Sequence, residues 1–272
     1  LALGRALAEK YGVDLLLDTS LYEGYSPHNG YELERVFGVD ASIAGQSDLK
    51  KMLGWRKTKL GSRLILKEWL NFLKGRKYYS ADNLPADFAD CYVVGFWQSE
   101  KYFNGYEKLV RNQFRFDSLL VGVNKSIELA ILNGDQAVSL HVRRGDYVSN
   151  QRANEFHGVC DMDYYGRAMA HIEKNVTNPI YYIFSDDSDW VKQNLKIRGE
   201  HHFVDNNSGL DSHIDMRLMS ICKHHIIANS TFSWWGAWLN GSQEKIVIAP
   251  AKWFVNLKRP TTDLLPPSWI RI

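Results

Sequence analysis

The segment from His141 to Asp146 holds the residues of this chain that are best suited to chemistry. It reads His-Val-Arg-Arg-Gly-Asp and follows the apolar run 137–140, which predicts a strand. Ligands of open α/β sheets bind at the carboxyl ends of the strands, where the two arginines would lie. A guanidinium stays charged at physiological pH, and its fork of N–H donors matches phosphate oxygens. We therefore expect Arg143 to neutralise an anion such as a diphosphate without a metal.

Two other interpretations of this segment stay open. The arginines could form ordinary surface ion pairs with a nearby acid such as Asp146. The tripeptide Arg144-Gly145-Asp146 is also used by some cell-attachment ligands, which present it on a protruding loop. Three residues match often by chance, so the adhesive interpretation has little support from the sequence.

The composition predicts a folded cytoplasmic protein. The 272 residues carry a net charge of +2, whereas nucleic-acid-binding domains are strongly basic, so we do not expect nucleic acid as a partner. We expect neither a cleavable leader nor a transmembrane segment, since no run approaches the roughly 20 apolar residues that span a bilayer. Cys91, Cys160 and Cys222 are widely spaced, which predicts reduced thiols without a disulfide framework or a zinc site.

Hydrophobic periodicity predicts an α/β fold of two domains. Residues 1–11 predict a helix, and 13–17 and 91–96 predict strands. A helix over 119–132 ends at Asn133-Gly134, which places the boundary between domains 1–133 and 134–272. The second domain alternates strands with helices, as in a parallel sheet with right-handed crossovers. We expect strands at 137–142, 180–184, 202–205, 225–228 and 245–249, and helices near 162–174, 188–195, 213–224 and 232–239.

Residues 50–77 form a basic amphipathic stretch. Ten lysines and arginines stand against one acid, Glu68, with Trp55, Leu64 and Trp69 among them. This composition is typical of segments that lie on anionic membranes, and equally of a solvated helix whose apolar stripe faces a core. We hypothesise weak peripheral contact with anionic lipid at the inner face of a membrane, or with a phospholipid-linked substrate.

Two further motifs are expected at the same edge of the sheet as the arginines. Phe184-Ser185-Asp186-Asp187 ends one strand, and the segment 229–236 ends another and begins a helix. Backbone N–H groups at a helix start bind phosphate readily. The alternative is that Ser230 or Thr231 only caps the helix, and the two roles are compatible.

Asp215 has two interpretations. Ser212 and Asp215 have the spacing of a capping box, so the spacing alone favours a role in satisfying a helix start. Alternatively, the Asp215 carboxylate accepts two N–H donors from the edge of a guanine base.

The ordered motifs resemble those of the α-1,2-fucosyltransferases, glycosyltransferase family 11. The resemblance rests on 141–147, 184–187 and 226–237, with shorter similarity to bacterial members at 95–100 and 157–160, and it covers nearly the whole chain. It implies GT-B architecture, in which two Rossmann-like domains enclose the active site in the cleft between them. The implied activity is inverting, metal-independent transfer of L-fucose from GDP-β-L-fucose to O2 of a terminal galactose. The implied acceptor is a galactose-terminated oligosaccharide, including lipid-linked surface polysaccharide units.

The resemblance also implies roles for individual residues. Arg143 would hold the β-phosphate, and Asp146 would orient the arginines or act as the base, of which we favour orientation. Domain 134–272 would bind the donor and domain 1–133 would face the acceptor. Family members carry a Gly-rich loop just before the helix at 1–11, so we expect part of the donor site to lie in that loop, which the printed sequence does not contain. The expected donor-binding residues are His141, Arg144, Ser185, Asp186, Asp215, Ser230, Thr231, Phe232 and Ser233.

A metal requirement and two other activities are the alternatives to this expectation. Asp186, Asp187 and Asp189 resemble the acid cluster with which other glycosyltransferases hold Mn²⁺, but the arginines already supply positive charge, so we expect no metal cofactor. The first alternative is a related fucosyltransferase of another linkage. The second is a lectin that binds galactosides through its tryptophans without catalysis.

Overall fold

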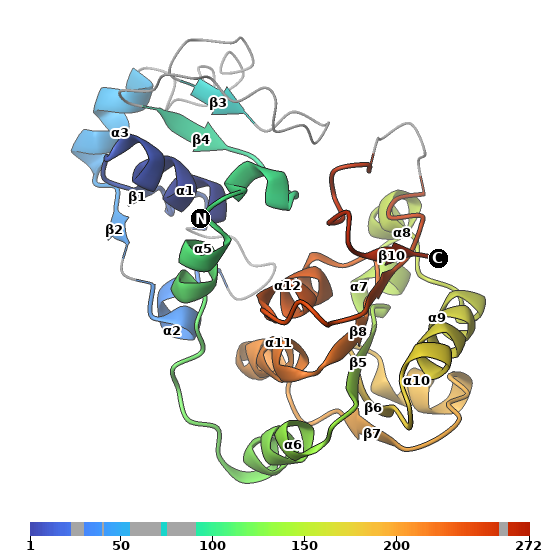
Figure 1. The fold of residues 1–272 in the computed structure, drawn as a ribbon. Coiled ribbons are helices and arrows are strands. Elements are labelled where there is room, and N and C mark those ends of the chain that lie inside the picture. Colours follow the sequence, from blue (N-terminus) through green and yellow to red (C-terminus); the bar gives the residue numbers. More distant parts are fainter. Residues whose placement is uncertain (23–29, 40, 55–71, 75–90, 256–260) are drawn as a thin grey trace. The chain divides into compact units, whose positions relative to one another are not determined.

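The computed structural model describes residues 1–22, 30–39, 41–54, 72–74, 91–255 and 261–272, which form two compact units (Figure 1). The first unit is Leu1–Asp117 with Pro260–Leu264, and the second is Ser118–Arg259 with Leu265–Ile272. The division therefore falls before helix α6 (Gly122–Asn133), whereas the sequence suggested a boundary after it. The reason is that Ile131 of α6 is buried in one cluster with residues of helix α11 (Ser212–Ile221) in the second unit.

The first unit combines short helices with two small parallel sheets. Strand β1 (Leu16–Leu17) pairs with β2 (Ser42–Ile43), and β3 (Phe72–Lys74) pairs with β4 (Tyr92–Val94). The helix predicted at 1–11 and the strands predicted at 13–17 and 91–96 are confirmed, although both strands are shorter. The helices are α1 (Ala2–Tyr11), α2 (Leu33–Phe37), α3 (Gln46–Leu53) and α5 (Glu107–Gln113), with 3-10 helices η1 (Ser20–Tyr22) and η4 (Glu100–Phe103).

The basic stretch 50–77 lies largely at 55–71 and 75–77, outside the described residues. None of the helices in the described part of the chain is long and apolar enough to cross a membrane.

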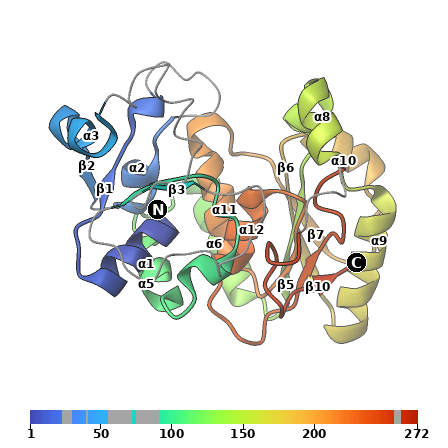
Figure 2. The ribbon, with the colours of Figure 1, turned by 90° about the horizontal axis from the view of Figure 1, so that it is seen from above.

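The second unit is a six-stranded parallel sheet with helices on both faces (Figures 1 and 2). The chain runs from the central strand β5 to β6 and β7 on one side, then returns to β8, β9 and β10 on the other, giving the order β10-β9-β8-β5-β6-β7. Such a reversal is the topological switch point at which doubly wound sheets bind ligands. The strands are β5 (Ala137–Val142), β6 (Ile180–Ser185), β7 (His201–Val204), β8 (His224–Ile226), β9 (Val247–Ala249) and β10 (Ile270–Arg271).

The predicted alternation of strands and helices in the second unit is confirmed, with shifts of a few residues at the ends. The sequence did not predict the two short helices that follow β5, nor the edge strand β10. The helices after α6 are α7 (Gly145–Ser149), α8 (Gln151–His157), α9 (Met162–Asn175), α10 (Ser188–Asn194), 3-10 helix η5 (Gly209–Asp211), α11 and α12 (Thr231–Leu239).

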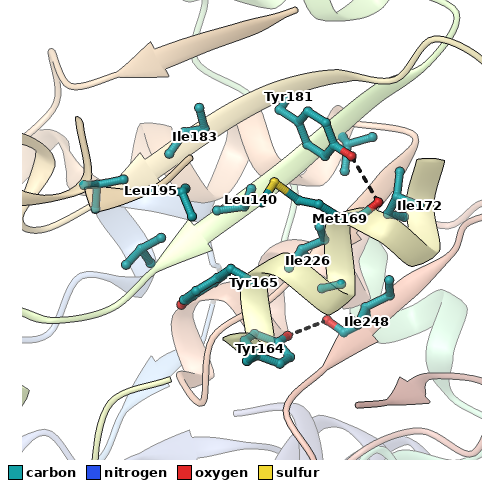
Figure 3. Packing of buried hydrophobic residues seen from close by; sticks show 14 of the residues in the cluster. Leu140, Tyr164, Tyr165, Met169, Ile172, Tyr181, Ile183, Leu195, Ile226 and Ile248 are labelled. Atoms are coloured by element: carbon teal, nitrogen blue, oxygen red, sulfur yellow. Dashed lines mark hydrogen bonds between the residues drawn. The ribbon is translucent and has the colours of Figure 1, made fainter. Parts of the chain in front are cut away.

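Strand β5 is buried along its whole length because helices cover both faces of the sheet. Val138, Leu140 and Val142 alternate along it and join the same cluster as residues of α9, which Figure 3 shows from close by. Alternation sends His141 to the opposite face, where its ring lies 5.8 Å from that of Phe232 on α12. The face of β5 that carries His141 is therefore covered by the start of α12.

Two tyrosines of α9 bind strand carbonyls where the sheet opens. The backbone pairing between β5 and β8 ends at Leu140 and Ile226. The carbonyls of the residues that follow, His141 and Ile227, therefore need other hydrogen-bond donors. The Tyr165 hydroxyl donates to the His141 carbonyl at 3.1 Å, and the Tyr164 hydroxyl donates to the Ile227 carbonyl at 2.6 Å. These bonds satisfy the backbone on both sides of the switch point and hold its shape.

Candidate functional site

The candidate site lies where β5 and β8 part. Arg143 and Arg144 follow β5 directly, and Asn229 and Ser230 connect β8 to α12. Asp186 arrives from the neighbouring strand β6, since the carboxyl ends of parallel strands share one edge of the sheet. The structure thus brings three separate sequence motifs together.

Arg143 is held by two carboxylates. Its Nη2 donates to Asp146 Oδ1 at 2.6 Å, and its Nη1 lies 3.0 Å from Asp186 Oδ2. The guanidinium also lies 5.4 Å from the centre of the Tyr147 ring, and the side chain is 25% exposed. A guanidinium has five N–H donors, so two carboxylate contacts leave donors for an anion while fixing the orientation. The geometry agrees with the orienting role expected for Asp146.

Arg144 makes contacts that hold it within the loop. Its backbone N–H donates to Asp186 Oδ1 at 2.8 Å, and its Nε donates to Asp187 Oδ2 at 3.1 Å. The guanidinium lies 3.4 Å from the centre of the Trp190 ring. Because Arg144 is engaged and Gly145 begins a helix, the tripeptide 144–146 is not a protruding loop, and the adhesive interpretation is wrong.

Asp186 contacts both arginines and explains why a glycine follows them at position 145. A Cβ at Gly145 would lie 2.5 Å from Asp186 Oδ2, closer than side-chain carbons come in folded proteins. Ser185 shapes the same loop, since its Oγ accepts the Asp187 backbone N–H at 3.0 Å. These contacts show that Ser185 and Asp186 build the loop that carries the arginines. Their expected role in donor binding stays a prediction.

His141 is a buried neutral imidazole beside the arginines. The side chain is buried, and burial, reinforced by the positive Arg143, lowers the pKa of His141 to about 3. Its Nδ1 is buried without a hydrogen-bond partner among the described residues. A buried polar atom without a partner costs free energy, and a bound ligand is one way to satisfy it. His141 thus remains a candidate ligand contact.

The residues expected to bind phosphate at the start of α12 have different environments. Ser230 caps the helix by accepting the Phe232 N–H at 3.3 Å, which confirms the capping interpretation. Ser233 is fully buried and donates to the Ser230 carbonyl at 3.3 Å, so its hydroxyl is used inside the helix. Thr231 is exposed at the first helical position. Thr231 and the backbone of this first turn are the parts positioned to meet an anion.

Asn229 lies at the candidate site, and the sequence analysis gave it no role of its own. Its Nδ2 donates to the carbonyls of His157 and Gly158 at 2.8 and 3.3 Å, and its Oδ1 accepts from the Cys160 thiol. The His157 ring in turn stacks on Tyr147, with centroids 4.6 Å apart. Asn229 therefore ties the loop after α8 to the end of β8. Its place in the motif 226–237 was the available signal.

The capping-box interpretation of Asp215 is wrong. The residue at the helix N-cap is Asp211, and the Ser212 hydroxyl donates to the Gly209 carbonyl. Asp215 is 9% exposed and accepts a hydrogen bond from Asn207 Nδ2 at 2.6 Å. Burial raises the pKa of Asp215 to about 7, against the opposing effect of that bond.

Amide side chains surround Asp215. Asn207 also accepts from Asn124 Nδ2 of α6 at 2.8 Å, and Asn206 Nδ2 donates to Asn124 Oδ1 at 2.7 Å. These residues leave Asp215 in a polar but uncharged neighbourhood. The dipeptide Asn206-Asn207 after a strand was visible in the sequence, but nothing there linked it to Asp215 or to α6.

The described residues contain no group of three or more His, Cys, Asp or Glu side chains arranged to hold a metal ion. Asp186 and Asp187 of the acid cluster are instead paired with Arg143 and Arg144.

The tryptophans of α12 are mainly core residues. On α12, Trp234 and Trp238 are at most 6% exposed and their rings are parallel, 6.1 Å apart, whereas Trp235 is half-buried. Trp269, which precedes β10, is also buried and packs against Trp234. Buried rings of this kind are not placed to bind a galactoside, as the lectin alternative requires.

Comparison with known proteins assigns the chain to a family. The model of glycosyl transferase family 11 matches residues 51–272. The chain belongs to glycosyl transferase family 11. It is 35% identical over 209 residues to the O-antigen biosynthesis glycosyltransferase WbnK of Escherichia coli, covering 74% of this chain and 68% of that one. It is 30% identical over 280 residues to an α-1,2-colitosyltransferase of Escherichia coli, covering 100% and 93%.

The chain is also similar to an animal enzyme and shares its fold with a solved structure. Galactoside α-(1,2)-fucosyltransferase 2 of Bos taurus is 33% identical over 141 residues, covering 50% of this chain and 40% of that one. The chain is thus a glycosyltransferase of the galactoside α-1,2-fucosyltransferase family. The fold matches the fucosyltransferase NodZ from Bradyrhizobium with a TM-score of 0.52 at 15% identity, covering 96% of this chain and 90% of that one.

Proposed function

We propose that this protein is an inverting fucosyltransferase of GT-B architecture that transfers L-fucose from GDP-β-L-fucose to O2 of a terminal galactose. The observation that carries the proposal is the placement of Arg143 at the switch point of the second unit, oriented by Asp146 and Asp186. The family supports the reaction type, and the bovine relative is named for α-(1,2)-fucosylation of a galactoside.

Arg143 is the residue that we assign to leaving-group stabilisation. In an inverting transfer the galactose hydroxyl attacks the anomeric carbon opposite the departing GDP, through a transition state with oxocarbenium character. Negative charge develops on the β-phosphate as the glycosidic bond breaks. A preorganised guanidinium next to the β-phosphate oxygen that leaves lowers the barrier more than a group that binds the substrate and the transition state equally.

Asp146 is assigned to orientation of Arg143. Its Oδ1 lies 2.6 Å from Arg143 Nη2, so the carboxylate is already engaged with a cation. A general base must instead reach the hydroxyl proton of the acceptor. The contact therefore favours a positioning role for Asp146.

The guanosine is assigned to Asp215 and His141. An ionised Asp215 can accept hydrogen bonds from the two N–H groups on the edge of guanine. In the protein without a ligand, burial raises the pKa of Asp215 to about 7 and so disfavours the charged form. Bound guanine would supply the donors that the carboxylate lacks. Neutral His141, with a buried Nδ1, would bind the donor as a hydrogen-bonding group and not as a cation.

The two units would divide the substrates between them. We propose that the second unit binds GDP-fucose without a metal and that the first unit binds the acceptor. We place the reaction in the cytoplasm. A galactose-terminated, lipid-linked polysaccharide unit is the proposed acceptor, supported by a relative named for O-antigen biosynthesis.

A screen of melting temperature against GDP, UDP, ADP and CMP tests the donor class. A nucleotide that binds the native state raises the melting temperature, so GDP alone should produce a shift. NMR of the product then gives the linkage. An equal response to all four nucleotides, or no response to GDP, would contradict the proposal.

A second donor sugar is supported by one observation. A relative that matches this chain over its full length is named an α-1,2-colitosyltransferase. Colitose is L-fucose without the hydroxyl at C3, so the two donors differ by one polar group. Comparing kcat/KM for GDP-fucose and GDP-colitose distinguishes them, and the proposed function requires the higher value for GDP-fucose.

A further inference from the structure

Phe96 is an aromatic side chain that the fold presents to the surroundings. It follows β4 in the first unit, and 88% of its surface is exposed. Single apolar residues are common at protein surfaces, so the exposure of Phe96 points to a ligand only together with the conformation of the turn that carries it. Leu119, in the second unit, has the same exposure and offers a matched comparison.

The turn that carries Phe96 adopts an unfavourable conformation. The next residue, Trp97, has a φ of 32°, a region that side chains with a Cβ rarely occupy. Its indole Nε1 is buried and has no hydrogen-bond partner among the described residues. Both features cost folding free energy, and such costs are retained mainly where a ligand or substrate requires the geometry.

Contacts with Asp263 and Tyr102 hold the same turn in place. The Ser99 hydroxyl donates to the Asp263 carbonyl, and Lys101 pairs with the Asp263 carboxylate. The Trp97 ring packs edge-on against Tyr102, with centroids 5.1 Å apart. The turn therefore holds Phe96 outward before any ligand binds, which lowers the entropy cost of binding.

We propose that Phe96 is a stacking platform for a sugar ring of the acceptor glycan. This inference rests on the proposed function, because it identifies the acceptor side of the same reaction. The C–H groups on one face of galactose form a flat apolar patch that matches an exposed phenyl ring, and stacking needs no hydrogen-bonding group from the protein. Phe96 belongs to the first unit, which the proposed function assigns to the acceptor, whereas the donor is assigned to the second unit. The acceptor is therefore the substrate that we assign to Phe96.

Steady-state kinetics of three variants test the inference. Phe96→Ala should raise the acceptor KM about tenfold, the factor expected when one ring face is withdrawn from contact. The donor KM, kcat and the GDP-induced shift in melting temperature should stay unchanged. Phe96→Trp should restore the acceptor KM, because it keeps an aromatic face. Leu119→Ala, the control of equal exposure, should leave all parameters unchanged.

The outcomes separate this inference from the proposed function. An unchanged acceptor KM in Phe96→Ala, with GDP binding intact, would overturn the inference alone. A rise in the donor KM instead of the acceptor KM would also overturn it. So would a later gel-filtration elution of Phe96→Ala than of the wild type, because that result would assign Phe96 to contacts between copies of the chain. Failure of the wild-type protein to bind GDP would overturn the proposed function and this inference with it.

Discussion

Replacing Asp215 by asparagine should stabilise the protein at neutral pH while it weakens guanine nucleotide binding. Burial raises the pKa of Asp215 from its ordinary value of 3.8 to about 7. Between these two values the folded state binds a proton that the unfolded state does not bind. The free energy of unfolding therefore falls as pH rises from about 4 to about 7.

The size of this effect follows from the pKa shift. One pKa unit corresponds to about 1.4 kcal/mol, so the whole shift is worth about 4 kcal/mol, of which about 2 kcal/mol falls between pH 5 and pH 7. Asp215→Asn keeps an Oδ1 that can accept from Asn207 but carries no charge. The stability advantage of the variant over the wild type should thus grow by about 2 kcal/mol over that range.

Urea denaturation of both proteins at pH 5, 6, 7 and 8 measures this difference. The buried histidines titrate in both proteins, so their contribution cancels in the comparison. Asp163→Asn, which changes an exposed acid on α9, is the control and should show no growing difference. The GDP-induced rise in melting temperature should be lost in Asp215→Asn alone. A stability difference that stays constant from pH 5 to pH 8 would refute the reasoning.

Four further predictions follow from the site and the fold. Arg143→Ala should lower kcat by about 100-fold or more at saturating substrates, the scale of losing one charge-stabilising donor, and near-normal turnover would count against the assignment. Gly145→Ala should push Asp186 away from Arg143 and weaken GDP binding by about tenfold in titration calorimetry, whereas unchanged affinity would show that Asp186 does not set the position of Arg143. Activity should persist in EDTA because arginines supply the positive charge, and loss of activity that Mn²⁺ restores would overturn this argument. Arg217→Ala removes one of the two cations that pair with buried Glu128 and should destabilise the protein by about 2 kcal/mol in urea, since Lys125 remains. Arg115→Ala, at an exposed pair, should change stability by less than about 1 kcal/mol.

The regular elements of the second unit were predictable because each carries its own local signal. The apolar run at 137–142 is long enough for a buried parallel strand, and α9 repeats its buried positions with helical spacing. Helices α7 and α8 were missed because their residues are largely polar and their positions depend on distant partners. Asn229 holds the end of α8 from across the sheet, a contact that no local pattern records.

The site was predictable where residue type and strand position decide the outcome. Arg143 and Asp146 lie as expected because a strand end and one helical turn bring them together. The contacts of Arg144 with Trp190 and of Ser233 with the Ser230 carbonyl could not be predicted, because they form only in the folded unit. Donor binding by Arg144 and Ser233 stays a prediction. The environment of Asp215 depends on Asn124 and Asn207, which come together only in the folded unit.

The structure of the protein with bound GDP tests the central claim most directly. We expect a guanidinium nitrogen of Arg143 at about 2.8 Å from a β-phosphate oxygen, with Asp146 and Asp186 still in contact with the same side chain. A complex in which the diphosphate lies away from the end of β5, with the Arg143 guanidinium facing water, would contradict it.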